Sequence, residues 1–268
     1  MEIFDSLSLL GQKRFARLAQ ILRNVPARLK ILPHNFKSSL ICYYLLQLFF
    51  SMPLKILYED NHLIAVYKPA GILVQGDKTG DVCLMDDVKE YLKIKYHKTG
   101  NVFLGLLHRL DRPVAGVVLF AKTSKGASRL SEQIRNHTIK KAYHVLVEGV
   151  PKKPKATLIN WLTKDEQNNI VTIYNQEMSG AQYAELDYEI VQSNKINSII
   201  KINLKTGRSH QIRAQLSNIG CPIVGDKKYG AKTPYKNGAI ALCATSLTFE
   251  TATGGEMKTV SIEPEFSL

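Results

Sequence analysis

The chain has 268 residues, of which 45% are hydrophobic and 22% are charged. This ordinary globular composition excludes a disordered chain, a fibrous protein and a protein built from many membrane spans. Lysine and arginine total 36 against 23 aspartates and glutamates, which gives a formal net charge of +13. A basic balance predicts a polyanionic partner, with nucleic acid the first expectation and an anionic membrane surface the second. Charge that serves only solubility is the plainer alternative.

Residues 1–52 are predicted to be a basic N-terminal extension ahead of one domain at residues 53–268. The extension holds seven basic and two acidic residues. Its apolar run at 40–50 is shorter than the roughly 20 residues that a membrane-spanning helix needs. Three interpretations stay open: an organelle presequence, a peripheral amphipathic segment, or upstream sequence outside a functional chain that begins at Met52. The last is favoured, because Met52 directly precedes the first strand pattern.

From residue 54 onward, short strand patterns outnumber helical ones. The helical spacing of Leu84, Val88 and Leu92 predicts one helix. A second helix is predicted with Ser124 as its N-cap, and a third from about Ser209. Strands are predicted at 55–58, 63–68, 102–107, 116–121, 139–148, 157–162, 170–174, 183–191, 198–204, 240–248 and 258–262. Many neighbouring strands are joined by turns, so the pattern predicts a mixed α/β enzyme whose sheet is largely antiparallel.

The four cysteines form no recognisable motif. Cys42, Cys83, Cys221 and Cys243 lack both C-x-x-C spacing and zinc-ligand spacing to histidine. We therefore predict free thiols in a reducing compartment, and hence a cytoplasmic protein, with organelle import through residues 1–52 as the lesser alternative. The sequence also lacks the phosphate-loop, dinucleotide and zinc-protease motifs, so neither a cofactor nor a metal is predicted.

The densest polar segment is His108-Arg109-Leu110-Asp111-Arg112, which lies between two apolar runs. This placement predicts that Asp111 lies on a short loop between two core strands. A carboxylate held in such a loop can act as a nucleophile or a base. The plainer alternative is an aspartate that forms only a structural ion pair.

A second polar segment holds Arg208, His210 and Arg213 at the predicted start of a helix, beside a glycine turn. Backbone N–H groups and cationic side chains converge at such a position, so it can hold a phosphate or another carboxylate. A charged helix start without a ligand is an equally good interpretation of this segment alone.

A third segment contains Lys140, Lys141 and Tyr143 on an alternating strand pattern. Tyr143 shares a face with Val145, so the plainer interpretation is a core aromatic residue beside solvated lysines. A functional role for this segment is indicated only when it is considered together with the other two.

Together these segments resemble the RluA-type pseudouridine synthases. Residues 108–112 are similar to the catalytic motif of that family, 67–71 to its K-P-x-G segment and 141–143 to its tyrosine motif. Residues 204–213 resemble T-G-R-x-H-Q-I-R, and residues 220–230 resemble the G-D-x-x-Y-G signature. The resemblance runs from about residue 54 to about 263. The leading His108 favours the RluA-type branch over the RsuA-type branch.

The resemblance implies the fold class α+β and a pseudouridine synthase fold, with a central mixed, mostly antiparallel sheet in two halves and a catalytic cleft between them. It implies an RNA isomerase without a cofactor or metal, which breaks the N1–C1′ bond of uridine and joins C5 to C1′. Asp111 would be the catalytic carboxylate, attacking the sugar or assisting elimination. Tyr143 would lie over the target base, and Arg208 would pair with Asp111.

The resemblance also implies an RNA-binding surface, with tRNA or rRNA as the partner. Basic groups would offset the few kcal/mol that flipping a base out of its stack costs. Arg109 would help to displace the target base. The remaining RNA-binding candidates are His108, Arg112, Lys140, Lys141, His210 and Arg213. No membrane contact and no obligatory protein partner are expected, and the chain is expected to be a monomer.

Three positions depart from the family pattern. Ala115 stands where serine is frequent, and Gln215 and Cys243 stand where histidine is frequent. These differences concern substrate choice rather than the type of reaction. One alternative is a non-catalytic RNA-binding or remodelling protein on the same fold. Another is a glycosidase, which is disfavoured because Asp111 has no obvious acidic partner in the other motifs.

Overall fold

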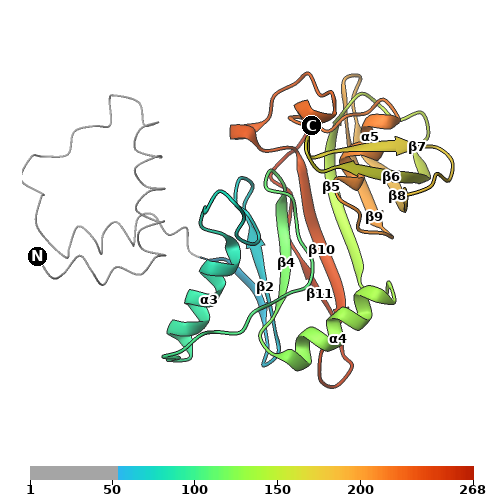
Figure 1. Ribbon diagram of the computed structural model, residues 1–268. Helices are drawn as coiled ribbons and strands as arrows, with labels where there is room; N and C mark the ends of the chain where they lie inside the picture. The colour runs from blue at the N-terminus through green and yellow to red at the C-terminus, as the bar shows by residue number, and fades with distance from the viewer. Residues whose placement is uncertain (1–53) are drawn as a thin grey trace, which may run out of the picture. The chain divides into compact units, whose positions relative to one another are not determined.

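The computed structural model describes residues 54–268 (Figure 1). The extension predicted at 1–52, the start at Met52 and Cys42 all lie outside the described residues. The described chain contains two compact units, one with residues 54–55 and 73–102, the other with 56–72 and 103–268. Within residues 54–268, no helix is long and apolar enough to cross a bilayer.

The smaller unit contains helix α3 (Leu84–Lys95), which confirms the helix predicted from the spacing of its apolar residues. The helix begins at a capping box, in which the Asp86 carboxylate accepts a hydrogen bond from the backbone N–H of Cys83 at 3.2 Å. Lys93 and Lys95 lie in its last turn, where cations interact favourably with the helix dipole. Local sequence therefore accounts for both ends of this helix.

The larger unit is built on one sheet of 11 strands, in the order β1-β2-β4-β10-β5-β9-β8-β6-β7, with β3 added to β4 and β11 added to β10. Within this unit β10 runs parallel to β4 and the other paired strands are antiparallel. The predicted α+β class with a mixed, mostly antiparallel sheet is confirmed. The strands are β1 (Ile56–Glu59), β2 (Leu63–Lys68), β3 (Gly105–Leu106), β4 (Ala115–Ala121), β5 (Lys140–Glu148), β6 (Lys155–Asp165), β7 (Ile170–Tyr174), β8 (Gln182–Ser193), β9 (Asn197–Leu204), β10 (Leu242–Glu250) and β11 (Met257–Ser261).

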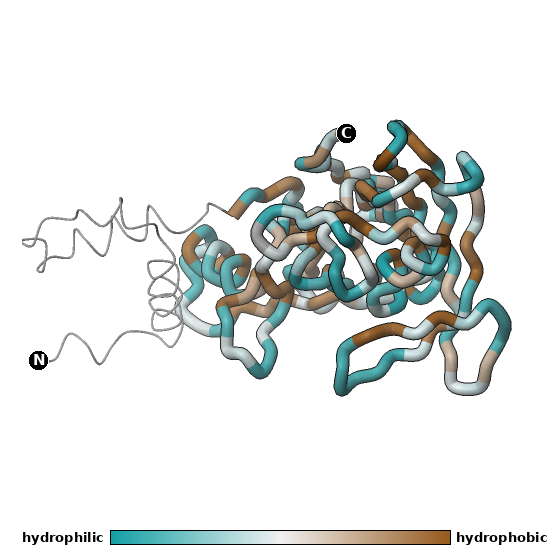
Figure 2. Tube along the Cα trace, turned by 90° about the horizontal axis from the view of Figure 1, so that it is seen from above, coloured by the Kyte–Doolittle hydropathy of each residue, from teal (hydrophilic) through white to brown (hydrophobic). Residues whose placement is uncertain are grey.

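Two helices of the larger unit cover apolar side chains of this sheet. Helix α4 (Ser124–Arg135) buries Leu130 against a cluster that includes Leu119 and Phe249. Helix α5 (Gln211–Asn218) places Ala214 in a second cluster, with Leu162 of β6 and Val171 of β7. Figure 2 shows the alternation of hydrophobic and hydrophilic stretches along the chain, as expected of strands with one buried face.

The starts of these two helices differ from their predicted positions. The cap of α4 is Thr123, whose hydroxyl accepts from the Gly126 N–H at 3.1 Å, so Ser124 is the first helical residue and not the cap. Helix α5 begins at Gln211 rather than at about Ser209, because the preceding His210 adopts a left-handed conformation with φ of 49°.

The strand predicted at 102–107 is reduced to the two residues of β3. Its pairing with β4 ends after the partners Leu106 and Phe120. The backbone N–H of Leu119 then donates to Nε2 of His108 at 3.1 Å. The His108 side chain therefore accepts a β4 hydrogen bond just beyond the last pair of β3 with β4. After this point the backbone leaves the sheet and forms the loop that carries Asp111.

Candidate active site

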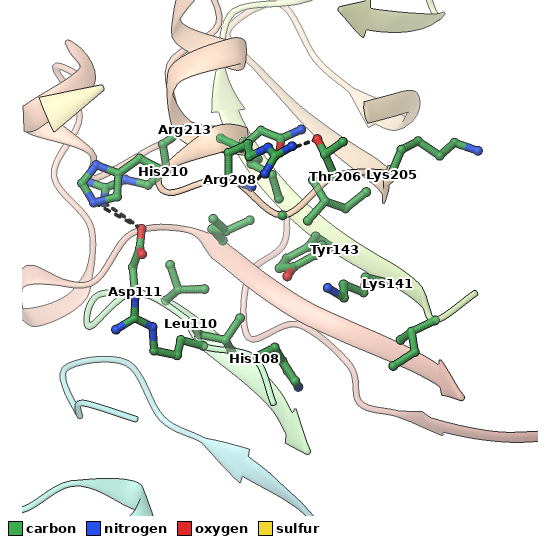
Figure 3. Close-up of a pocket in the computed structure, with 18 of the residues that line it drawn as sticks. His108, Leu110, Asp111, Lys141, Tyr143, Lys205, Thr206, Arg208, His210 and Arg213 are labelled. Carbon is green, nitrogen blue, oxygen red and sulfur yellow. Dashed lines mark hydrogen bonds and ion pairs between the residues drawn. The ribbon is translucent and has the colours of Figure 1, made fainter. Parts of the chain in front are cut away.

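A pocket of about 330 Å³ lies within the larger unit, where the β3–β4 loop, strand β5 and the β9–α5 loop meet (Figure 3). Its lining includes Asp111 from the first loop, Lys141 and Tyr143 from β5, Arg208 from the last loop and Arg213 from α5. The fold thus brings together the three polar segments that are separate in the sequence.

Arg213 connects two carboxylates at the base of this pocket. Its Nη1 donates to Oδ2 of Asp111 at 3.0 Å, and its Nε and Nη2 donate to Asp226 at 2.6 and 2.9 Å. The Asp226 side chain is only 1% exposed, and that of Arg213 is 7% exposed. Burial disfavours the charged guanidinium, but the hydrogen bonds and charges of Asp226 and Asp111 raise the pKa of Arg213. Arg213 therefore stays charged and fixes the orientation of the Asp111 carboxylate.

The structure pairs Asp111 with Arg213, whereas the sequence analysis predicts Arg208 as its partner. Nε of Arg208 instead donates to the backbone carbonyl of Tyr183 at 2.9 Å, and Arg208 is exposed. The reason is local: Arg208 lies in the loop before α5, where its backbone N–H donates to Oε1 of Gln211. Arg213 lies in the first turn of α5 and faces the pocket.

Tyr143 is buried, at 8% exposure, and lines the pocket from the middle of β5. Its strand is held on both sides, with Ala244 of β10 and Ile202 of β9 as its partners. Burial raises the pKa of Tyr143, and the negative charge of Asp111 acts in the same direction. The phenol is therefore neutral near pH 7 and keeps its proton in the pocket.

Lys141 lies two residues before Tyr143 and on the same face of β5. Figure 3 shows its side chain beside Tyr143 in the pocket. Burial lowers the pKa of the Lys141 ammonium, and within residues 54–268 no carboxylate pairs with it. The neighbouring Lys140 is exposed and lines only the adjoining hollow, which shares Lys141 and Arg208 with the pocket. Of the two predicted lysines, only Lys141 can therefore face a ligand in the pocket.

Three further residues of the Asp111 loop have different surroundings. His108 accepts the Leu119 N–H, and burial lowers its pKa to about 3, so it is a neutral residue that holds the loop to β4. His108 also lines the pocket, so its predicted contact with RNA stays a prediction. Arg109 is exposed at the pocket, as an RNA-binding residue requires, and Nε of Arg112 donates to the Gly71 carbonyl at 3.1 Å.

Lys68 is a structural residue of the site whose role the sequence analysis does not assign. It is 0% exposed, and its Nζ donates to the carbonyls of Pro69, Ile72 and Arg112 at 3.0, 2.8 and 3.2 Å. Burial lowers its pKa to about 7, while the charge of Asp111 acts in the opposite direction. The K-P-x-G segment thus fastens the peptide that follows Asp111. The sequence signals are the K-P-x-G resemblance and a lysine at the end of an apolar strand, and neither indicates what the ammonium group contacts.

His210 is buried behind Asp111 rather than exposed to a polyanion. Its Nε2 lies 3.7 Å from Oδ2 of Asp111, and its Nδ1 lies 2.8 Å from the hydroxyl of Tyr229. Burial lowers the pKa of His210, so the ring is neutral near pH 7. His210 also lines the pocket, so its predicted contact with RNA stays a prediction. Asp226 and Tyr229, which the sequence analysis recognises only as part of a signature, are both members of this buried network.

Comparison with known proteins identifies the protein family to which the chain belongs. The RNA pseudouridylate synthase family model matches residues 62–218. The chain is 34% identical over 218 residues to ribosomal large subunit pseudouridine synthase C of Buchnera aphidicola subsp. Schizaphis graminum, covering 77% of this chain and 66% of that protein. It is 32% identical over 191 residues to tRNA pseudouridine synthase C of Salmonella typhimurium, covering 66% and 70%.

A third relative, an uncharacterized RNA pseudouridine synthase of Chlorobaculum parvum, is 32% identical over 193 residues, which are 68% of this chain and 57% of that protein. The chain thus spans little more than half of that relative. Among solved structures, human RNA pseudouridylate synthase domain containing 4 superposes with a TM-score of 0.65 at 22% identity, covering 78% of this chain and 88% of that chain. This likeness shows the fold.

The pocket and its arginine-held carboxylate lie on the fold of an RNA-modifying enzyme class. The chain belongs to the RNA pseudouridylate synthase family. Both the RluA-type assignment and the pseudouridine synthase fold, which the motifs predict, are confirmed.

Proposed function

We propose that this chain isomerises uridines in structured RNA to pseudouridine, with Asp111 as the catalytic carboxylate and without a cofactor. One observation carries the proposal: Asp111 is held at 3.0 Å by the buried Arg213, in a pocket that Tyr143 lines from the adjacent strand. The printed names of the relatives, which include both a ribosomal and a tRNA enzyme, support RNA as the substrate class.

The proposed reaction rearranges one nucleotide and needs no other reactant. The N1–C1′ bond breaks, the base turns, C5 joins C1′, N1 gains a proton and C5 loses one. Asp111 assists either by attack on C1′ or by promoting elimination at C2′. The target base must leave its stack to reach the carboxylate. Tyr143 lies where a flipped base enters, and its aromatic ring can stack on that base.

The proposed RNA contacts follow from the exposure of the basic residues. Arg109 and Arg208 are exposed at the pocket and can contact the phosphates that flank the target nucleotide. Lys141 lies deeper, beside Tyr143, and can contact the target nucleotide itself. The excess positive charge of the chain favours association with RNA of any sequence.

We expect Lys141→Met to lower kcat/KM about tenfold and to reduce the salt dependence of RNA binding by roughly one phosphate contact. The reason is that Lys141 presents a half-buried cation to the pocket without a carboxylate partner. Lys140→Met removes the same charge on the opposite face of β5, outside the pocket, and should have a clearly smaller effect. Equal losses in the two variants would contradict the placement of Lys141 against the target nucleotide.

Tritium release tests the proposed function directly. RNA labelled at C5 of uridine, as tRNA and as rRNA that lack the modification, is incubated with the full chain. Forming the C5–C1′ bond expels the C5 hydrogen, so release of tritium into water is the expected result. If neither RNA releases tritium while both bind the chain, the non-catalytic RNA-binding alternative takes the place of this proposal.

The remaining parts of the proposal concern the chain as a whole. We propose that residues 53–268 make up the catalytic domain and that the chain acts as a monomer in the cytoplasm. The described cysteines, Cys83, Cys221 and Cys243, are free thiols, which supports a reducing compartment. Whether tRNA or rRNA is the target is decided by the same labelled substrates.

A further inference from the structure

Tyr229 contacts both side chains that face Asp111. It lies in the short 3₁₀ helix η2 (Lys227–Tyr229) and is 8% exposed. Its hydroxyl lies 2.8 Å from Nδ1 of His210, and the two rings meet edge to face with centroids 5.7 Å apart. The guanidinium carbon of Arg213 lies 5.0 Å from the centre of the Tyr229 ring. One residue thus supports both of the groups that surround the carboxylate.

The hydrogen bonds of the Tyr229 hydroxyl determine where its proton lies. The backbone N–H of Val171 donates to this oxygen at 2.9 Å. The oxygen also has one proton to donate, and a buried hydroxyl needs an acceptor for it. Within residues 54–268, the acceptor that it reaches is Nδ1 of His210. Tyr229 is therefore the donor, and the neutral imidazole of His210 carries its own proton on Nε2.

We infer that Tyr229 is a positioning residue that fixes the tautomer of His210, so that Nε2–H faces the carboxylate of Asp111. The inference rests on the proposed catalytic role of Asp111. In this tautomer the N–H dipole points toward Oδ2 at 3.7 Å and stabilises its negative charge. In the other tautomer the Nε2 lone pair would face the carboxylate, and repulsion would turn Asp111 away from its hydrogen bond with Arg213.

The backbone conformation of His210 indicates that neighbouring contacts hold this residue in place. Its φ of 49° is left-handed, a conformation that residues other than glycine rarely adopt. Such a residue keeps this conformation when neighbouring contacts over-determine it, and it is then frequently part of a functional site. His210 lies directly before the first turn of α5, and its hydrogen bond to Tyr229 is one of these contacts.

The charges around His210 keep the ring neutral, so its tautomer matters. Burial lowers the pKa of the imidazole, and the cations Arg213 and Lys228 act in the same direction. The carboxylates of Asp111 and Asp226 oppose them. The tyrosine hydroxyl does not titrate near neutral pH, because burial raises the pKa of Tyr229. Near pH 7 the network therefore contains a neutral phenol and a neutral imidazole.

Tyr229→Phe tests the inference, because it keeps the ring beside Arg213 and removes only the hydroxyl. We expect kcat for tritium release to fall about tenfold with KM unchanged, because the misdirected tautomer disturbs the carboxylate and not RNA binding. Nitrogen NMR of histidine-labelled protein, with His210→Gln to assign the signals, should show wild-type His210 as the Nε2–H tautomer and the variant as a mixture. Tyr188→Phe is the matched control: it removes another buried hydroxyl, which donates to the Lys153 carbonyl.

The outcomes separate this inference from the proposed function. An Nδ1–H tautomer in the wild-type protein overturns the inference, and this measurement does not depend on activity. Unchanged kcat and unchanged nitrogen signals in Tyr229→Phe overturn it as well. A wild-type chain that releases no tritium counts against the proposed isomerase activity, and the nitrogen spectra still decide the tautomer.

Discussion

Asp111→Asn is expected to reduce tritium release roughly 10⁴-fold or below detection, while RNA affinity stays within about threefold. Asparagine has the same shape as aspartate, but its amide can neither attack C1′ nor accept a proton at neutral pH. Stability should change by less than about 1 kcal/mol, because the Asp111 side chain is 31% exposed. Arg213 also keeps its two hydrogen bonds to Asp226 in this variant.

The matched control for this experiment is Asp187→Asn. Asp187 is 37% exposed and pairs with Lys205 at 3.1 Å, so the variant removes a carboxylate of similar exposure that does not itself line the pocket. It should retain full activity. Measurable turnover by Asp111→Asn at more than a few per cent of the wild-type rate would show that another group performs the chemistry.

Much of the fold follows from local sequence patterns. The strand at 170–174 is predicted at its observed bounds, and the strand at 139–148 differs from β5 by one residue. The order of strands in the sheet is not local information. Placing β10 between β4 and β5 depends on the parallel pair Cys243 and Ala115 and on the close approach at Gly116. There φ is +142°, and a Cβ atom would lie 2.5 Å from that of Ala244, so only glycine fits.

The candidate site is predictable in its members and less so in their roles. The sequence motifs place Asp111 and Tyr143 in one pocket, as the structure has them. They do not tell which arginine faces Asp111, because that depends on where the loop before α5 holds each side chain. Arg208 lies in this loop and donates to the Tyr183 carbonyl, whereas Arg213, in the first turn of α5, reaches Asp111. The surroundings of His108 are also not evident from the sequence pattern. A histidine beside charged residues suggests a surface group, but the ring accepts a hydrogen bond from the Leu119 N–H inside the fold.

Arg213→Lys is expected to have the largest effect on stability, a loss of about 1–3 kcal/mol in the free energy of unfolding. An ammonium group cannot make two hydrogen bonds to Asp226 and also reach Asp111. The Asp226 carboxylate, at 1% exposure, would then be buried without its full set of partners. Thermal or urea unfolding measures this loss, with Arg129→Lys, an exposed arginine of α4 in an exposed ion pair, as a control that should change little.

The double variant Arg213→Met with Asp226→Leu separates the structural role of Arg213 from its role at the carboxylate. Replacing both members of a buried ion pair by apolar residues removes the unpaired charge, so most of the lost stability should return. Asp111, however, still lacks the guanidinium that donates to Oδ2. We therefore expect a well-folded protein whose tritium release remains at least about 100-fold below wild type. If activity returns together with stability, Arg213 serves the fold alone and does not orient the catalytic carboxylate.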